Sequence, residues 1–506
     1  MGGNGGTLAR GEMGEPSAPD DLFRRVMPPI MLPVFLAAAD GTAVATALPS
    51  IGAAFGDVAF LQWVVVANLI AGTIAAPVYG RLGDQLGRKR LLLASLSVFM
   101  VASLLCAAAP ATGWLLAARA LQGAGAGGLI TLSQALLGEN VPARALGRFQ
   151  GYFAGCIVAG SSFGPVAGGL LTQWFGWPAV FLANLPLGAA AIGLLLRLPA
   201  SPPRRGRPGF DVAGIALLTA VIVPLLLALS EVRALDVAAV PGIAGLLAVA
   251  CAAFPLLLWQ QRRASAPLLP LALLREPAIW RANVMSACSG ASLVAMVTFL
   301  PIYFQVVDGA SPSVSGLLLL PLTAGVSGGS VMTGWLVSRT GRTALFPGIG
   351  LLVTALSLVI LALWAPRINL VQLSIVLAVG GVCQGTSMLV AQVTSQIVAG
   401  AGRLGVAAGA VQLARSLGSA FGVGLAGAVL FSTLAWTDPR TAELFGEMVR
   451  HGPRLLAALP PDQQALVEAE IAAAFRGVFL TVACFSCIIV AMAWTQPVRR
   501  LERPEG

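Results

Sequence analysis

Fourteen apolar runs, each long enough to cross a lipid bilayer, dominate this sequence. A membrane-spanning helix needs about 20 predominantly apolar residues. Hydrophobic residues make up 57% of the 506 residues and charged residues only 10%, whereas soluble domains carry about 25% charged residues. The sequence therefore predicts an all-α polytopic membrane protein with 14 transmembrane helices near residues 28–48, 60–79, 91–109, 113–137, 149–172, 177–196, 212–230, 238–259, 283–304, 313–337, 344–365, 370–397, 404–432 and 475–494.

The basic residues orient these spans. If both termini lie in the cytoplasm, 23 of the 31 Lys and Arg residues fall on the cytoplasmic side and 6 on the outer side, while Arg119 and Arg415 lie within helices. Cytoplasmic loops of membrane proteins carry such an excess, so topology explains the net charge of +10 and no nucleic-acid partner is expected. Because Arg outnumbers Lys 30 to 1, a GC-rich bacterial genome is indicated. We expect a multi-pass protein of the bacterial cytoplasmic (inner) membrane.

The turn between the second and third runs concentrates charge. Residues 80–90 read Gly-Arg-Leu-Gly-Asp-Gln-Leu-Gly-Arg-Lys-Arg, which places five charges in eleven residues. Its glycines permit a short crossing between antiparallel helices, and its bases hold the turn on the cytoplasmic side. Asp84 is the single acid among these bases.

The second half of the chain carries a weaker copy of this turn. Residues 334–342 match it at a shift of 254 residues, with Ser338 in place of Asp84. Residues 160–169 match residues 418–427 at a shift of 258, with five of the ten positions identical. Two similar shifts indicate a duplicated half. The repeat assigns six spans to each half and leaves two spans between them.

Together these features resemble the major facilitator superfamily of transporters. The turn at 80–90 resembles its motif A, G-x-L-a-D-x-x-G-R-[RK], and residues 160–169 resemble its motif C. Residues 119–123 (Arg-Ala-Leu-Gln-Gly) resemble motif B, and residues 39–42 with 47–49 resemble the span-one motif of the 14-span drug:proton antiporter branch. The resemblance covers nearly the whole chain. It implies a substrate site between the halves, near the bilayer midplane.

Five parts of the chain follow from the repeat. We expect a disordered cytoplasmic N-terminus, a six-helix half, a linker with two extra transmembrane helices, a second six-helix half and a cytoplasmic tail, at residues 1–27, 28–196, 197–282, 283–496 and 497–506. The second half contains a long external loop at 433–474, in which Asp438-Pro439 is typical of a helix start and predicts a short helix.

The resemblance implies a gating role for motif A. In the family, the acid of this motif joins charge interactions that hold one conformation and break when the transporter switches. We assign this role to Asp84 with Arg88 as its partner, and Gly80, Gly87 and Lys89 complete the motif. The alternative is a topology anchor with an incidental acid.

Three glycines of the fifth span recur every fourth residue. Gly160, Gly164 and Gly168 therefore lie on one helical face, where small residues let another helix approach closely. Pro165 bends the helix by removing a backbone hydrogen bond, and Gly169 completes the string. Ordinary packing explains the spacing equally well. The resemblance to motif C, which the family associates with exporters and with the interface between the halves, favours export.

Two charged residues within spans are candidates for proton coupling. Asp40 lies well inside the first span, and burial disfavours the charged form of a carboxyl group, so we propose Asp40 as the leading protonation site. The alternative is a structural role, such as capping a helix or pairing with an Arg. The family implicates the Arg of motif B, here Arg119, in proton coupling. Its alternative is a side chain that extends to the membrane surface from a helix end.

Polar and aromatic residues complete a candidate substrate pocket. Arg415 could balance Asp40, attract an anionic substrate group or lie near the cytoplasmic edge. In the family, Tyr often stands where this chain has Asn68. The pocket candidates are Trp63, Asn68, Gln122, Tyr152 and Arg415, with Phe299, Tyr303 and Trp335 as further lining aromatics.

The sequence as a whole favours a proton-coupled antiporter that exports amphipathic or hydrophobic small molecules by alternating access, that is, drug efflux. An exporter of a specific metabolite, lipid or siderophore is the alternative. A membrane-embedded enzyme is disfavoured because the chain has one His and no Walker sequence. We expect no catalytic residue, no metal site and no cofactor, with the proton motive force as energy source. Expected partners are the substrate, protons and membrane lipid. A periplasmic adaptor stays open, and otherwise we expect a monomer.

Overall fold

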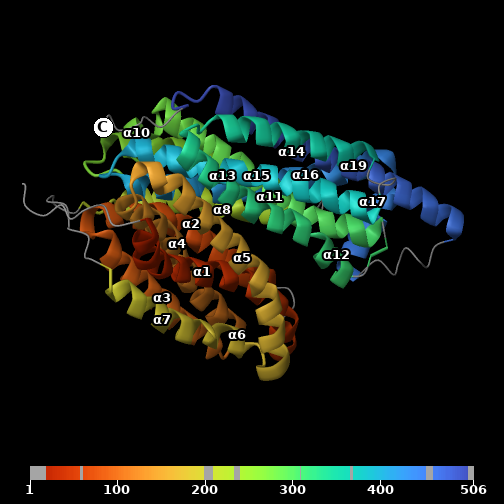
Figure 1. The fold of residues 1–506 in the computed structure, drawn as a ribbon. Coiled ribbons are helices and arrows are strands. Elements are labelled where there is room, and N and C mark those ends of the chain that lie inside the picture. Colours follow the sequence, from red (N-terminus) through yellow and green to blue (C-terminus); the bar gives the residue numbers. More distant parts are fainter. Residues whose placement is uncertain are drawn as a thin grey trace, which may run out of the picture.

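Long helices, roughly aligned, make up the computed structural model, which describes residues 19–56, 61–198, 209–232, 240–307, 309–310, 312–364, 369–451 and 460–499. Within these residues, 14 helices are long and apolar enough to cross a membrane. This confirms the predicted all-α polytopic fold. The helices gather into two bundles, one from each half of the chain (Figure 1).

The first bundle holds the first six spans. The sixth span is broken near Ala183 into two shorter helices. The helices are α1 (Pro19–Phe55), α2 (Leu61–Leu86), α3 (Arg88–Ala107), α4 (Thr112–Asn140), α5 (Ala143–Phe175), α6 (Pro178–Leu182) and α7 (Asn184–Leu196). Because α1 already begins at Pro19, the predicted disordered N-terminus of 1–27 is wrong for its last residues, and residues 1–18 lie outside the described residues.

The two inserted spans and the second bundle follow. They are α8 (Val212–Val232), α9 (Val240–Arg263), α10 (Leu271–Leu274), α11 (Pro277–Val306), α12 (Pro312–Leu318), α13 (Leu320–Thr340), α14 (Leu345–Trp364), α15 (Leu370–Ala399), α16 (Leu404–Thr437), α17 (Pro439–His451) and α19 (Pro461–Trp494). Residues 199–208 of the predicted linker and residues 500–506 of the predicted tail lie outside the described residues.

The predicted external loop at 433–474 is largely helical. α16 continues to Thr437, and α19 already begins at Pro461. Between them the predicted short helix is present as α17, and Asp438 Oδ1 accepts a hydrogen bond of 3.0 Å from the Arg440 N–H at its start. The prediction of a loop was wrong here because apolar length marks only the part of a helix that meets lipid.

Helix packing follows the sequence repeat. In the first half α1 packs on α5, α2 on α4 and α3 on α7, and in the second half α11 packs on α16, α13 on α15 and α14 on α19. Between the halves the two main contacts also form a matching pair, α2 with α16 and α5 with α13.

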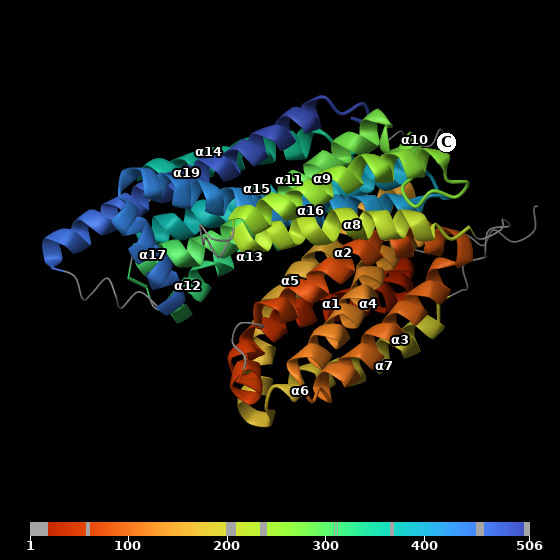
Figure 2. The ribbon, with the colours of Figure 1, turned by 180° about the vertical axis from the view of Figure 1, so that it is seen from behind.

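The halves meet through glycines at one end. A Cβ on Gly80 of α2 would collide with the Gly405 carbonyl oxygen of α16, and a Cβ on Gly334 of α13 would collide with the Gly147 carbonyl oxygen of α5. Gly80 and Gly334 are partners in the repeat. We call this end, where α2 ends and α16 begins, the closed end. From it the two bundles diverge toward α6, α12 and α17, as both views show (Figures 1 and 2).

The inserted helices form a hairpin that touches both halves. α8 packs on α9 and also on α2 and α16 (Figure 2). Asp211 fixes the hairpin near the closed end, because its carboxylate accepts hydrogen bonds from the N–H groups of Gly214 (2.8 Å) and Leu268 (3.1 Å) and from the side chains of Gln260 (2.6 Å) and Gln261 (2.7 Å). Burial by itself would raise the pKa of Asp211, but these four donors outweigh it and leave the pKa lowered.

We expect Asp211→Asn to loosen this hairpin in a pH-dependent way. A carboxylate whose pKa is lowered by folding stabilises the fold above its unfolded value, and this stability is lost as the pH falls through the folded value. The variant should therefore melt several degrees below wild type at pH 7, a loss of about 1–3 kcal/mol, with a difference that shrinks toward pH 3. Thermal unfolding of the purified protein in detergent measures this. An equal difference at both pH values would contradict it.

Candidate functional site

Asp84 caps a helix of the opposite half. Its two carboxylate oxygens accept hydrogen bonds from the backbone N–H groups of Gly405 (2.9 Å) and Val406 (3.0 Å), in the first turn of α16. The N-cap residue of α16, Arg403, makes no such side-chain bond. An acid at a helix N-terminus satisfies free N–H groups and complements the helix dipole. Asp84 thereby ties the end of α2 to the start of α16.

Arg88 holds Asp84 in this position. Its guanidinium donates to Asp84 Oδ1 at 2.6 Å, to Glu139 at the end of α4 at 2.9 Å, and to the Ala401 carbonyl oxygen of the opposite half at 2.9 Å. Gly87, just before Arg88, adopts a φ of 98°, a backbone conformation that favours glycine. The motif A residues thus build a buried ionic cluster that spans both halves.

The repeated copy of the motif makes no comparable cluster. Ser338 Oγ donates to the Trp335 carbonyl oxygen of its own helix at 2.8 Å, and Arg342 is exposed. The closed end is therefore held by an ionic contact between α2 and α16, whereas the matching α5–α13 crossing relies on glycine packing.

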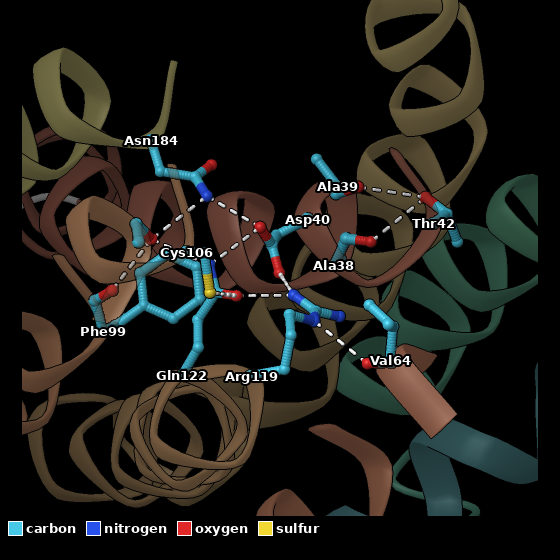
Figure 3. A network of polar contacts seen from close by, with 11 residues as sticks. Ala38, Ala39, Asp40, Thr42, Val64, Phe99, Cys106, Arg119, Gln122 and Asn184 are labelled. Carbon is cyan, nitrogen blue, oxygen red and sulfur yellow. Dashed lines mark hydrogen bonds and ion pairs between the residues drawn. The ribbon is translucent and has the colours of Figure 1, made fainter. Parts of the chain in front are cut away.

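A second polar cluster lies deep within the first half (Figure 3). Asp40 of α1 accepts hydrogen bonds from Arg119 (2.9 Å), Gln122 (3.0 Å) and Asn184 (2.7 Å). The Arg119 and Asp40 side chains are only 0% and 1% exposed. Ser103 accepts from Gln122 at 2.8 Å and so adds α3 to the cluster. Four helices, α1, α3, α4 and α7, together supply these side chains.

Arg119 is held away from the membrane surface. Besides Asp40, it donates to Gln122 Oε1 at 2.5 Å and to the Val64 carbonyl oxygen at 3.2 Å, and it lies 5.8 Å from the centre of the Phe181 ring. Its second terminal nitrogen is buried without a partner. The alternative of a side chain that extends to the surface is therefore wrong. Placing an unpaired charged side chain at the middle of a membrane helix costs about 2.5–3.5 kcal/mol. The ion pair with Asp40 offsets this cost for Arg119.

The glycine face of α5 packs directly on the helix that carries Asp40. A Cβ on Gly160 would lie 2.9 Å from the Phe35 carbonyl oxygen, and a Cβ on Gly164 would lie 3.1 Å from the Ala43 nitrogen and closer still to Thr42 Oγ1. Both neighbours belong to the same half of the chain. The structure thus places the motif C glycines against α1, and not between the halves as the resemblance implied.

Gly164→Ala should therefore disturb the packing of α1 on α5. Because overpacking a tight contact costs about 1–3 kcal/mol, we expect a lower melting temperature for the purified variant. Gly169→Ala is the matched control, since a Cβ there meets nothing within 4 Å. Replacing helical Gly by Ala in open space is neutral or stabilising by up to about 1 kcal/mol. Equal melting temperatures for the two variants would contradict the close packing at Gly164.

The pocket candidates are placed in several different environments. Gln122 belongs to the Asp40 cluster, and Tyr152 accepts a hydrogen bond from Arg148 at 3.2 Å. Asn68 packs its backbone on Gly123, and its Oδ1 has no partner. Trp63 is partly buried, near the start of α2.

The further aromatic candidates do not gather at one site. Phe299 and Tyr303 are buried in an apolar core of the second half. Trp335 is 42% exposed and lies beneath the Arg339 guanidinium, 3.7 Å from its ring centre. We predicted these aromatics as candidate lining residues, but aromatic rings in spans serve packing and the membrane interface as readily.

Several members of the two clusters were not predicted from the sequence as partners of Asp84 or Asp40. Glu139 and the first turn of α16 complete the Asp84 cluster, and Ser103 and Asn184 complete the Asp40 cluster. Polar residues inside apolar spans are the available signal for the latter two, because such residues usually face a partner or a cavity.

In a comparison with known families, the chain matches the Major Facilitator Superfamily model over residues 30–423, which agrees with the fold. The chain belongs to the major facilitator superfamily. An uncharacterized MFS-type transporter of Mycobacterium tuberculosis is 35% identical over 404 residues, which are 79% of this chain and 58% of that protein. The chain thus matches little more than half of that relative's length.

Two further proteins resemble this member of the superfamily. The multidrug transporter protein MdtP of Bacillus subtilis is 29% identical over 406 residues, 79% of this chain and 74% of that protein. Among solved structures, the proton:xylose symporter XylE aligns with a TM-score of 0.63 at 15% identity, over 94% of this chain and 96% of that one. At such low identity the likeness shows the fold alone.

Proposed function

We propose that this facilitator-superfamily member is a proton-coupled antiporter that exports amphipathic small molecules across the cytoplasmic membrane of a bacterium. The observation that carries the proposal is the buried Asp40–Arg119 pair, 2.9 Å apart and almost unexposed. Similarity to a multidrug transporter and to efflux pumps supports export. The glycine face of α5, with its resemblance to motif C, supports it as well.

Asp40 is suited to take up and release a proton. In the conformation described, its side-chain partners Arg119, Gln122 and Asn184 all donate hydrogen bonds to it. Protonation would leave Arg119 as an unpaired buried charge. Since a buried charge without a partner is strongly unfavourable, proton uptake at Asp40 is coupled to movement of Arg119 and of the helices that hold it.

Alternating access then follows from the two clusters. The ionic cluster at Asp84 holds the closed end shut while the bundles diverge at the other end (Figure 1). With the closed end in the cytoplasm, as the basic loops favour, this conformation faces outward. Proton uptake at Asp40 repacks α1 against α5, and return to the inward-facing form requires the Asp84 contacts to break.

Efflux of the neutral amphipathic dye Nile red from an efflux-deficient bacterial host tests this function. Energised cells that express the protein should lose preloaded dye several-fold faster than cells with an empty vector, and an uncoupler should remove the difference. Drug-susceptibility profiling of the same strains extends the test to other compounds. Dye loss that is unchanged by the protein, or that resists the uncoupler, would count against proton-driven export.

A further inference from the structure

Arg415 is a charged residue within a membrane-spanning helix that has no acidic partner in the part of the chain described. It lies eleven residues into α16, and the ion pairs found there join Arg88 to Asp84 and Glu139, and Arg119 to Asp40. Its Nε is buried and makes no hydrogen bond. Neither cluster described above uses it.

The position of Arg415 places it on the face of α16 that packs against the opposite half. On the same helix, Leu404 and Ala408 pack against Ala135 of α4, which belongs to the opposite half. Arg415 follows Ala408 by seven residues, which is about two turns, so it shares that face and lies about 10 Å farther from the closed end. Gly409, the residue after Ala408 on α16, lies against Ala76 and Pro77 of α2. Arg415 therefore lies about two turns beyond the contact of Ala408 with α4, on the face of α16 that is turned to the opposite half.

The neighbouring helix leaves room for this side chain. A Cβ on Gly290 of α11 would lie 3.0 Å from Arg415 Cγ and 2.7 Å from Ser419 Oγ. The aliphatic part of the Arg415 side chain therefore packs against the α11 backbone at a glycine. At the shift of 258 that relates α5 to α16, the first half has Ile157 in the corresponding place. The charge is thus a feature of one half alone and was not inherited through the repeat.

Asp40 is already fully engaged and does not serve as the counterion. Both of its oxygens accept hydrogen bonds, from Arg119, Gln122 and Asn184, within the opposite half. The Asp40–Arg119 pair is neutral as a unit, which leaves the positive charge of Arg415 uncompensated. An unpaired charge in the membrane interior marks a substrate or ion pathway.

We propose that Arg415 binds the anionic group of the substrate, and that the preferred substrates are amphipathic organic anions, carboxylates in particular. A guanidinium presents a planar fork of donors that matches a carboxylate. The apolar remainder of such a substrate suits the surrounding spans. This inference rests on the proposed export function and names its substrate class.

Three probes with one skeleton test it: pyrenebutyrate, the neutral pyrenebutyramide and the cationic pyrenebutylamine. Fluorescence titration of the purified full-length protein should show that wild type binds the acid about tenfold more tightly than the amide, equivalent to about 1.4 kcal/mol. Arg415→Gln should remove this preference and leave amide affinity within about twofold. The matched control is Arg476→Gln, because Arg476 is an exposed arginine of the long helix α19, and it should keep the preference.

Equal binding of acid and amide by wild type overturns the proposal. So does an equal loss for both probes in Arg415→Gln, which would indicate a general structural role. If Arg415→Gln does not elute as a monodisperse protein, Arg415→Lys replaces it. A lysine keeps the charge without the fork, so it should weaken acid binding about threefold and spare the amide, and unchanged acid binding would count against the proposal.

Proton-driven uptake of the same probes into inverted membrane vesicles separates this inference from the export function. Uptake of the amide at the same rate as the acid overturns the anion site and leaves export intact. A binding preference that depends on Arg415, without uptake of any probe, supports the anion site and counts against export.

Discussion

Asp40→Asn should abolish proton-coupled export while the protein remains inserted in the membrane. The amide has nearly the size of the carboxyl group but carries no charge and cannot be protonated in the physiological range. Export should fall at least tenfold, which corresponds to about 1.4 kcal/mol or more, and the remaining transport should no longer respond to the pH gradient. Dye efflux at several external pH values measures both effects.

Loss of charge at Asp40 also leaves Arg119 buried and unpaired. Removing one partner of a buried pair costs about 3–5 kcal/mol, so Asp40→Asn should melt below wild type. The double variant Asp40→Asn with Arg119→Gln removes both charges and should recover much of the melting temperature without recovering export. Proton-dependent export by the stably inserted single variant would show that Asp40 is not the protonation site.

Asp84→Asn should stop the transport cycle by releasing the closed end. An asparagine offers one acceptor oxygen, and its NH₂ group would face the N–H groups that Asp84 accepts from α16. Hydrogen bonds to charged groups contribute about 1.5–3 kcal/mol each, so the closed conformation should lose at least tenfold in population. We expect export to fall at least tenfold, and the amides of Gly405 and Val406 to exchange hydrogen with solvent correspondingly faster.

The repeat supplies a matched control for this change. Ser338 occupies the position equivalent to Asp84, and its hydroxyl bonds to its own helix. Ser338→Ala should therefore leave export within about twofold of wild type, since a solvated helix-surface bond of this kind contributes little. Normal export by an inserted Asp84→Asn variant would mean that the cluster is a topology anchor and not part of the cycle.

Much of the fold could be predicted because apolar length and charge placement act on each span locally. All fourteen spans are present as helices, and the internal shifts of 254 and 258 residues anticipate which helices pack together. The helix ends were predicted poorly. α16 and α19 continue well past their apolar segments, because a helix does not have to stop where lipid contact stops.

The site residues were predicted singly and not as partners. Asp40 and Arg119 stand 79 positions apart, and Asp84 and Gly405 stand 321 apart. Charge inside an apolar run shows that a partner is needed, but its identity depends on how helices pack in three dimensions. The role of Gly405 was beyond reach for another reason, since its bond to Asp84 uses backbone N–H, which every sequence offers at every non-proline position.

The one-sided ionic cluster also gives the closed end a direction of opening. The α2–α16 flank is joined by charged hydrogen bonds, whereas near the α5–α13 flank the bonds between halves include a neutral amide pair, Gln150 to Gln396, at 3.2 Å. Charge-assisted bonds are roughly twice as strong as neutral ones. The two halves are therefore expected to separate first along α5 and α13. The contact between α2 and α16 then serves as the hinge until the hydrogen bonds of Asp84 break. The opening at the closed end would then form first on the side away from the inserted α8–α9 hairpin, whose α8 packs on α2 and α16.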